Sequence, residues 1–390
     1  MIFTLVKNEL IKMFKRSKTI IVFVLFLVCM FLFMYIDYYD YSTITESSSE
    51  WSTSEYEESK KSLEETLKKE DFSEVSEEDI IEQIKYLQIK IDQENGKATW
   101  KDEAEFTLKR DMKELAKTTE NEEKKYLQEE IEVLQYCIDN NVEKVDKWDF
   151  NCGNFSSNFM NNVGTIILAV GIAVFLSDIV SGESTPPNLK FLIVQPVSRG
   201  KILLSKFIAS IISVVTLIGG AELLAFLGLG IAKGFEILKQ PVIIGQKYNV
   251  IIDQGAYEAN GILGSGHIVS MGEFLIQAFL FQLLFIITVS AFIILLSTLC
   301  KSSMTSMAVS TVSILVISII SLVSPSVSSK IAHLVFLNYG TTPKVIVGDA
   351  IRSCYNEAFT VQNGIIVCIV TIIICYIISS IKFRRKDILI

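Results

Sequence analysis

Six long apolar segments constrain the fold of this chain more than any other feature. About 20 apolar residues at 1.5 Å each cross a hydrocarbon core of roughly 30 Å, so such runs are typical of membrane spans. Half of the chain (50%) is hydrophobic, and the mean hydropathy is +0.41. These features predict an all-α polytopic membrane protein with six transmembrane helices. The expected spans are residues 20–36, 163–180, 202–231, 274–299, 304–323 and 365–381.

Basic residues orient these spans. Residues 1–18 mix apolar side chains with lysine and arginine, Lys301 lies in the short turn after the fourth span, and a basic cluster follows the last span. Because lysine and arginine concentrate in cytoplasmic segments, both termini are expected in the cytoplasm. Residues 1–18 also predict a basic amphipathic helix in the membrane interface, although a simple cytoplasmic anchor fits them as well.

A polar block separates the first span from the second, which divides the chain into residues 1–40, 41–160 and 161–390. Between Asp40 and Asp149 there are 32 acidic and 16 basic residues, so this block carries 16 net negative charges. The rest of the chain carries 8 net positive charges, because the total is −8. The acidic surface is most simply a solvated face; a platform for a cationic peptide is the alternative. Its sign disfavours nucleic acid as a partner.

Helical periodicity runs through residues 41–160, which are expected to lie outside the cell. Apolar residues recur at spacings of 4, 3 and 4, which predicts the seams of antiparallel helices in a coiled-coil-like bundle. Breaks are expected at residues 95–96 and 118–121, with one helix over residues 120–145. The seam residues are Ile80, Ile84, Leu87 and Ile91, then Leu108, Met112 and Leu115, then Leu127, Ile131, Leu134 and Ile138.

Motifs for chemistry are missing from the sequence. There is no GxxxxGK[ST] phosphate-binding loop, no HExxH, no GxSxG and no CxxC pair, and the chain has only two histidines. The sequence therefore predicts no catalytic, cofactor-binding or metal-binding residues and no enzymatic activity in this chain. A disulfide between Cys137 and Cys152 is left open. Glu222 lies within an apolar span, where an acid is costly. It is expected to line a transport pathway, to bond a neighbouring helix, or to lie nearer the outer interface.

The connector between the second and third spans is a short basic segment, residues 181–205, with a small apolar stretch at 191–194. It closely resembles the corresponding connector of ABC-2 type transporter permeases. In that family an acidic residue leads into a short helix, followed by a P-[VI]-S-R turn and a lysine that enters the next span. The matching residues here are Glu183, Phe191, Leu192, Pro196, Ser198, Arg199 and Lys206.

The resemblance covers about residues 1–40 and 160–390 and implies a membrane subunit of a bacterial ABC exporter in the plasma membrane. It implies a homo- or heterodimer of permease subunits in the lipid bilayer, with two copies of a separate ABC ATPase that bind ATP and magnesium. Segment 181–205 would then dock on the ATPase as a coupling helix. The polar block at residues 41–160, called the insert below, resembles the large first outer loop of some permeases in peptide-antibiotic resistance and sodium export.

The function expected is ATP-driven outward movement of an antimicrobial peptide, drug or lipid-like compound. Export of sodium or another small ion is an alternative, although Glu222 is the one buried acid available for it. A membrane receptor or scaffold that transports nothing is the third possibility. An apolar cytoplasmic docking segment argues against the scaffold.

Overall fold

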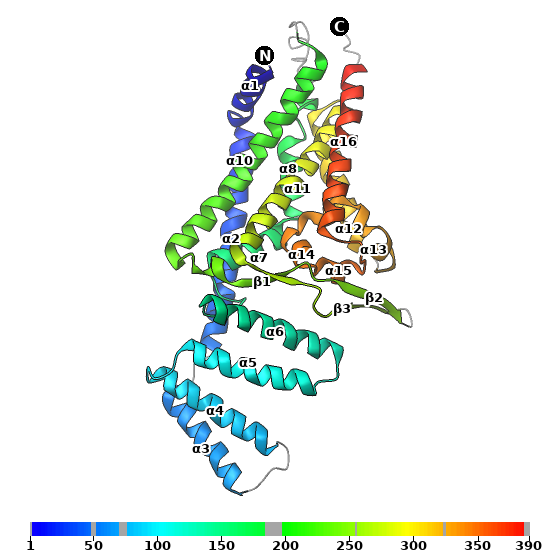
Figure 1. Cartoon of the computed structure of the whole chain (residues 1–390). Coiled ribbons are helices and arrows are strands. Elements are labelled where there is room, and N and C mark those ends of the chain that lie inside the picture. Colours follow the sequence, from blue (N-terminus) through cyan, green and yellow to red (C-terminus); the bar gives the residue numbers. More distant parts are fainter. Residues whose placement is uncertain are drawn as a thin grey trace.

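The computed structural model describes residues 2–47, 52–69, 76–183, 197–253, 256–322 and 325–385. The molecule is elongated, with a bundle of long helices at one end and a stack of four shorter helices at the other (Figure 1). The helices of the bundle are α1 (Ile2–Phe14), α2 (Ser17–Ser47), α7 (Cys152–Val163), α8 (Ile167–Leu176), α10 (Arg199–Lys233), α11 (Met271–Leu299), α12 (Ser303–Leu322) and α16 (Val361–Arg385).

Helix α11 forms the centre of this bundle. It packs against α8, α10, α12 and α16, and 61% of its most apolar stretch is buried. Its start is defined by Ser270, whose side chain accepts a hydrogen bond from the backbone of Glu273. The peripheral helix α2 has 11% of its most apolar stretch buried. An apolar helix with so little protein around it is suited to contact lipid or another membrane subunit.

Among the described residues, four helices are long and apolar enough to cross a membrane: α2, α10, α11 and α16. A fifth span results if α7 and α8, which are bent by 67°, are counted together. The apolar part of helix α12, Ser303–Ile319, is shorter than the 18 residues that the four longer helices exceed. The chain is thus a mostly helical, membrane-embedded protein, and six spans remains a prediction.

The bend between α7 and α8 falls at the start of the span expected over residues 163–180, so the helix of that span begins at Ile167 instead. At the bend the backbone touches a second backbone segment, since a Cβ on Gly164 would lie 2.0 Å from the carbonyl oxygen of Gly340. Glycine permits this approach because it has no Cβ. Helix α7 packs in the bundle, with Phe159 against Phe26 of α2 at 5.9 Å between ring centroids. The boundary drawn at residue 160 therefore falls inside α7.

Four strands depart from the all-α expectation. Strand β1 (Pro241–Ile244) pairs antiparallel with β4 (His267–Ser270), in the register Pro241↔Ser270. Strand β2 (Tyr248–Asp253) pairs antiparallel with β3 (Ala256–Gly261), in the register Tyr248↔Gly261. The β-branched run at residues 250–252 favours a strand. Both two-stranded sheets lie between the bundle and the stacked helices (Figure 1).

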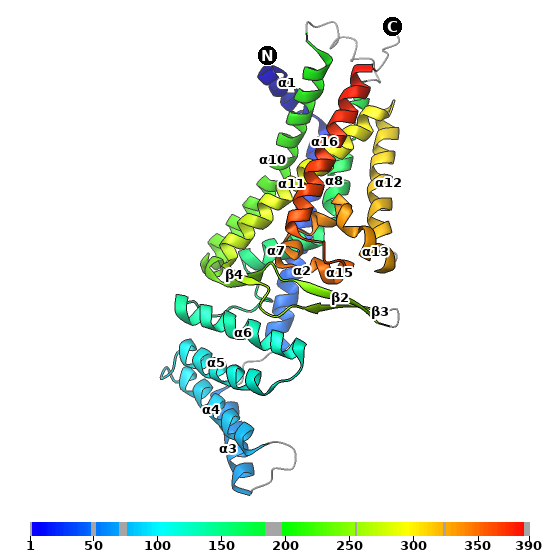
Figure 2. The same ribbon diagram turned by 45° about the vertical axis from the view of Figure 1, so that its right-hand side comes forward.

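The stacked helices form two hairpins, as Figure 2 shows from a second side. They are α3 (Thr53–Lys69), α4 (Glu77–Glu94), α5 (Trp100–Lys117) and α6 (Asn121–Asn140). Both expected breaks are present. The seams of α4 and α6 are partly as expected, with Leu87 and Leu134 buried. The seam expected for α5 is wrong, because Met112 is 48% exposed and Asp111 is buried instead.

Helix α6 is shorter than the expected helix over residues 120–145. It ends where Asn141 adopts a left-handed conformation (φ 55°), a common helix terminator. It also lies across the sheets rather than pointing away from the bundle (Figure 1). Gln246 Nε2 donates to Glu129 Oε1 of α6 at 2.8 Å, and the Lys125 ammonium sits 4.5 Å from the Tyr248 ring centroid. The insert is thus packed onto the strands.

Short helices cover the end of the bundle that faces the strands (Figure 1). They are α13 (Pro325–Ile331), η3 (Ala332–Leu334), η4 (Phe336–Gly340), α14 (Thr342–Val347) and α15 (Ala350–Cys354). The Tyr248 hydroxyl donates to Asp349 Oδ1 at 2.9 Å, which ties β2 to these helices. Burial and the charge of Asp349 raise the pKa of Tyr248 well above its usual value, so the phenol stays a donor.

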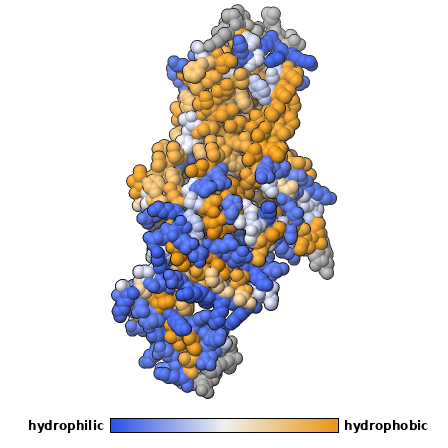
Figure 3. Space-filling view, viewed as in Figure 1, coloured by the Kyte–Doolittle hydropathy of each residue, from blue (hydrophilic) through white to orange (hydrophobic). Residues whose placement is uncertain are grey.

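The surface divides in the same way as the fold. Apolar residues cover much of the bundle, and polar residues cover the stacked helices (Figure 3). Helix α1 and the last turn of α16 lie at the end of the bundle opposite the insert (Figure 1).

Cys137 and Cys152 are both buried, and the structure has them as free thiols.

Candidate functional site

A buried ion-pair cluster lies where the connector leaves the bundle. Glu183 ends the short turn η1 (Ser181–Glu183), which follows α8, and its side chain is 3% exposed. Lys206 lies two turns into α10 and has no solvent exposure. Lys206 Nζ donates to Glu183 Oε1 at 2.7 Å. Two residues 23 positions apart, one at each end of the connector, therefore hold those ends together.

Helix α1 completes the cluster. Its inner face, formed by Val6, Glu9 and Met13, packs against α10. Lys206 Nζ also donates to Glu9 Oε1 at 3.1 Å. Lys12 Nζ donates to the same oxygen of Glu183 that Lys206 contacts. The amphipathic character expected for residues 1–18 is present, and the polar member of its buried face is an acid.

The charges of this cluster balance, with two ammonium groups facing two carboxylates. A buried ion is costly without a partner, whereas a matched set recovers most of the desolvation energy. The carboxylates are only partly satisfied, because Glu9 Oε2 and Glu183 Oε2 are buried with no hydrogen-bond partner among the described residues. Displacement of one member would leave an uncompensated charge, so α1, η1 and α10 are expected to move as a unit.

The turn before Glu183 is fixed by a serine of the central helix. Ser297 Oγ of α11 accepts from the backbone N–H of Val180 (3.2 Å) and of Ser181 (3.1 Å). It donates to the carbonyl oxygen of Ser177 at 2.7 Å. One hydroxyl thus satisfies three backbone groups at the end of α8, where an α-helix leaves groups without internal partners. Movement of the connector base would be transmitted directly to α11.

A second ion-pair set joins α1 and α2 to the same turn. Asp178 accepts from Lys18 Nζ at 3.0 Å and from Arg16 at 3.4 Å, and all three side chains are about a quarter exposed. Pairs with this exposure contribute little to stability, on the order of 1 kcal/mol or less. Their consequence is geometric, because they hold the α1–α2 corner beside the connector.

Glu222 belongs to a different site, 16 residues further along α10 and roughly 24 Å along the helix axis at 1.5 Å per residue. Gln282 Nε2 of α11 donates to Glu222 Oε1 at 2.9 Å. Glu222 Oε2 has no partner among the described residues. The side chain lines a cavity of about 380 Å³ between α2, α7, α10 and α11.

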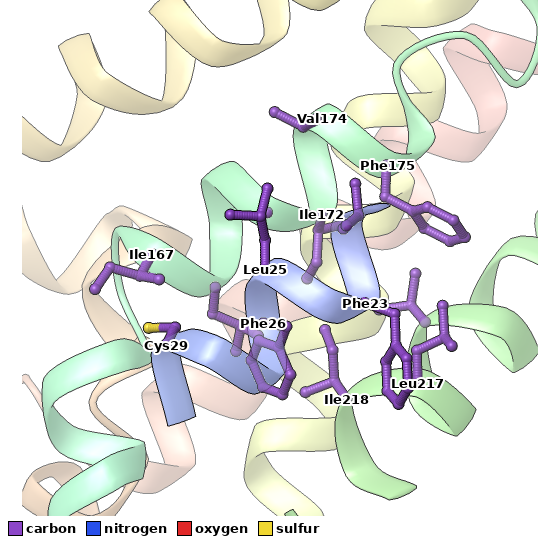
Figure 4. A pocket seen from close by; sticks show the side chains of 14 residues that line it. Phe23, Leu25, Phe26, Cys29, Ile167, Ile172, Val174, Phe175, Leu217 and Ile218 are labelled. Atoms are coloured by element: carbon purple, nitrogen blue, oxygen red, sulfur yellow. The ribbon is translucent and has the colours of Figure 1, made fainter. Parts of the chain in front are cut away.

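A second cavity, of about 300 Å³, lies closer to the connector between α2, α8 and α10. Phe23 and Phe26 of α2, Phe175 of α8 and Leu217 of α10 surround it (Figure 4). Cys29 is its least apolar lining residue, and none of the lining residues is charged. The two cavities therefore differ in one respect that matters for ligands, the presence of an acid.

Family comparison decides the class of this membrane protein. The family model described as ABC-2 family transporter protein matches residues 3–388. The chain belongs to the ABC-2 transporter family. Members of this family are the permease subunits of ABC transporters and typically work with an ABC ATPase. A search of curated proteins finds no match.

The permease brings some of its sequence-predicted site residues together and separates others. Glu183 and Lys206 are in direct contact, whereas Glu222 stands apart from them. Ser198 is the residue before α10, and Arg199 Nη1 donates to the backbone oxygen of Arg384 at 2.9 Å. Phe191, Leu192 and Pro196 lie outside the described residues.

Sequence reasoning missed Glu9 and Lys12 in the permease cluster and Gln282 beside Glu222. A signal for Glu9 was available, since it is the one acid in residues 1–18 and falls on the apolar face of that helix. Gln282 is one of two glutamines in an uncharged, mostly apolar run, residues 274–299. Nothing in the sequence indicates which of the two faces Glu222, because that depends on the packing of α10 against α11.

Proposed function

We propose that this permease exports an amphipathic or lipid-like compound, with the energy supplied by ATP hydrolysis in a separate ATPase. Segment 181–205 is the element that receives the movement of the ATPase. Two ATPase copies, which hold the ATP and magnesium, would serve two permease subunits. The second permease subunit would lie in the same bilayer and is either identical to this chain or different from it.

The observation that carries this proposal is the cluster of Glu9, Lys12, Glu183 and Lys206 at the base of segment 181–205. A segment pushed by a partner does work on the bundle only if its ends are rigidly joined to the spans. The two contacts of the fully buried Lys206, with Glu9 and with Glu183, supply such a joint, because breaking them leaves a buried ammonium without a partner. Ser297 extends the joint to the central helix α11.

The proposed orientation places α1, segment 181–205 and the end of α16 in the cytoplasm of a bacterial cell. The basic residues at this end and the acidic insert at the other support it. The insert, residues 41–160, would then face outward and pack on the strands above the bundle. Glu222 would lie on or beside the path of the substrate, in the outer half of its span.

The test is stimulation of the ATPase by the permease. Phe191→Asp and Leu192→Asp should abolish the stimulation, because a charged side chain does not fit an apolar docking groove. The matched control is Ile251→Asp with Ile252→Asp in strand β2, where the side chains are 47% and 63% exposed at the end of the bundle opposite α1. ATPase activity in the purified complex should fall for the first pair alone. Full stimulation after the first pair of changes would refute the coupling role.

A further inference from the structure

The cavity beside Glu222 has the dimensions and lining of a small-molecule site. Its volume of about 380 Å³ falls in the range of ligand pockets, roughly 300–1,000 Å³. Four helices contribute to it, and its walls are almost entirely apolar. Such sites bind a hydrocarbon body through the walls and fix its orientation through a few polar groups. Here the polar group that differs from the rest is a carboxyl.

Glu222 is the only ionisable side chain among the described residues that line this cavity. It is 9% exposed, and Gln282 satisfies one of its oxygens. The other oxygen, Oε2, is buried and has no hydrogen-bond partner among the described residues. A buried acid with half of its acceptor capacity unused is completed by a cation or a donor that comes from outside the chain.

Aromatic rings give the cavity a second affinity for positive charge. Phe155, Phe159, Phe226 and Phe279 all line it, and Phe155 and Phe159 are stacked with ring centroids 5.8 Å apart. The face of an aromatic ring attracts an ammonium group within about 6 Å of its centroid, most strongly where water is excluded. Met30 and Met160 add polarizable surface that adapts to irregular apolar ligands.

The cavity reaches the apolar side of the bundle. Leu223 of α10 and Ile276 and Leu280 of α11 line it, and they are 54%, 63% and 60% exposed. These residues are part of the apolar surface that the bundle presents to its surroundings. A ligand with a hydrocarbon tail could therefore enter from the bilayer without crossing a polar barrier.

We infer that this cavity is a binding site for an amphipathic monocation, with the ammonium group beside Glu222 and the hydrocarbon body among the phenylalanines of α7, α10 and α11. This inference rests on the proposed export function and specifies the chemistry of its substrate. The cavity of Figure 4 lacks an acid, so nothing in it pairs with a cationic head group. The two cavities thus make an internal comparison within one molecule.

The experiment is photolabelling of the full-length chain in phosphatidylcholine nanodiscs, which carry no net charge. The probes are three diazirine-bearing dodecyl chains that end in trimethylammonium, in sulfonate or in a hydroxyl group. Labelled peptides are mapped by mass spectrometry. The ammonium probe should label the peptides of α7, α10 and α11 that line the Glu222 cavity, and unlabelled dodecyltrimethylammonium should compete. The sulfonate probe should label them at least about tenfold less, because an anion meets the carboxyl there.

Variants locate the effect at the carboxyl. Glu222→Gln should reduce ammonium labelling at this cavity at least about tenfold and leave labelling by the alcohol unchanged. The matched control is Glu273→Gln, an exposed acid in the first turn of α11, which should change neither. Ile276→Trp at the rim should reduce labelling by the ammonium and alcohol probes together.

Two results would overturn the inference: undiminished ammonium labelling in Glu222→Gln, or sulfonate labelling as strong as ammonium labelling. If Glu222→Gln fails to fold, the comparison of probes on the unaltered chain still decides. The assay needs no ATPase, so its failure is distinct from failure of the coupling proposal. Cation binding without ATPase stimulation would refute the proposed export and leave the site in place.

Discussion

At the scale of single residues, Lys206 has the most demanding environment in the described part of the chain. Its ammonium has no solvent exposure and lies between Glu9 and Glu183. Lys206→Met should destabilise the bundle by about 3–5 kcal/mol, because it leaves two carboxylates against one remaining ammonium, that of Lys12. The measurement is the thermal unfolding midpoint, together with amide exchange of α1, which should become faster.

The control for this change is Lys113→Met in the insert. Lys113 also contacts two carboxylates, those of Glu78 and Glu82, but its side chain is 46% exposed. Water solvates both partners when it is removed, so the midpoint should hardly change. Equal effects of the two substitutions would show that burial of the cluster has no energetic consequence.

The pair Lys90–Glu103 predicts how the insert responds to acid. Burial alone raises the pKa of Glu103, but the hydrogen bond and charge of Lys90 outweigh it and hold the pKa below its ordinary value of 4.5. A lowered pKa means that the pair stabilises the fold above pH 4.5 and that this contribution is lost as the pH falls further. Protection of the α4 and α5 amides, measured relative to their intrinsic exchange rate at each pH, should fall below pH 4.5, and less so in Glu103→Gln. Identical acid responses of both proteins would contradict this assignment.

At the scale of elements, the turn between α8 and η1 depends on one hydroxyl. Ser297→Ala leaves the buried N–H groups of Val180 and Ser181 without their acceptor, at a cost of about 1–3 kcal/mol. Amide exchange in this turn should become faster. Ser290→Ala on the same helix is the control, because the Ser290 hydroxyl is buried with no hydrogen-bond partner among the described residues. Similar exchange in both variants would exclude the role assigned to Ser297.

Elements could be predicted from the sequence where one physical signal dominates. Apolar length identified α2, α10, α11 and α16, and Asn95-Gly96 marked the break between α4 and α5. The break at Gly164 could not be predicted, since it arises from contact with Gly340, 176 residues away. The strands were missed because each has four to six residues and depends on cross-strand pairs.

The same limit applies to the site. Glu183 and Lys206 were identified from the connector motif, and the structure places them in direct contact. The partners Glu9 and Gln282 were missed, because each comes from a helix distant in sequence. A single sequence reports which polar residues are unusual for a span. It does not report which of them the packing of helices brings together.

At the scale of the whole molecule, the chain joins an ion-pair cluster at one end to an insert at the other through α10 and α11. The insert packs on strands β1 and β3, the strands contact α14 and α15, and α14 packs on α11. Movement at the ends of segment 181–205 therefore has a continuous packed route to the stacked helices of the insert. The acidic cavity of α10 and α11 lies along that route.

The most direct test is site-specific photo-crosslinking in the assembled transporter. A benzoylphenylalanine in place of Phe191 lies in the connector, and one in place of Trp148, a residue 72% exposed, lies at the insert end. Residue 191 should crosslink to the ATPase and residue 148 should not. A crosslink to the ATPase from residue 148, or none from residue 191, would contradict both the proposed orientation and the coupling role of segment 181–205.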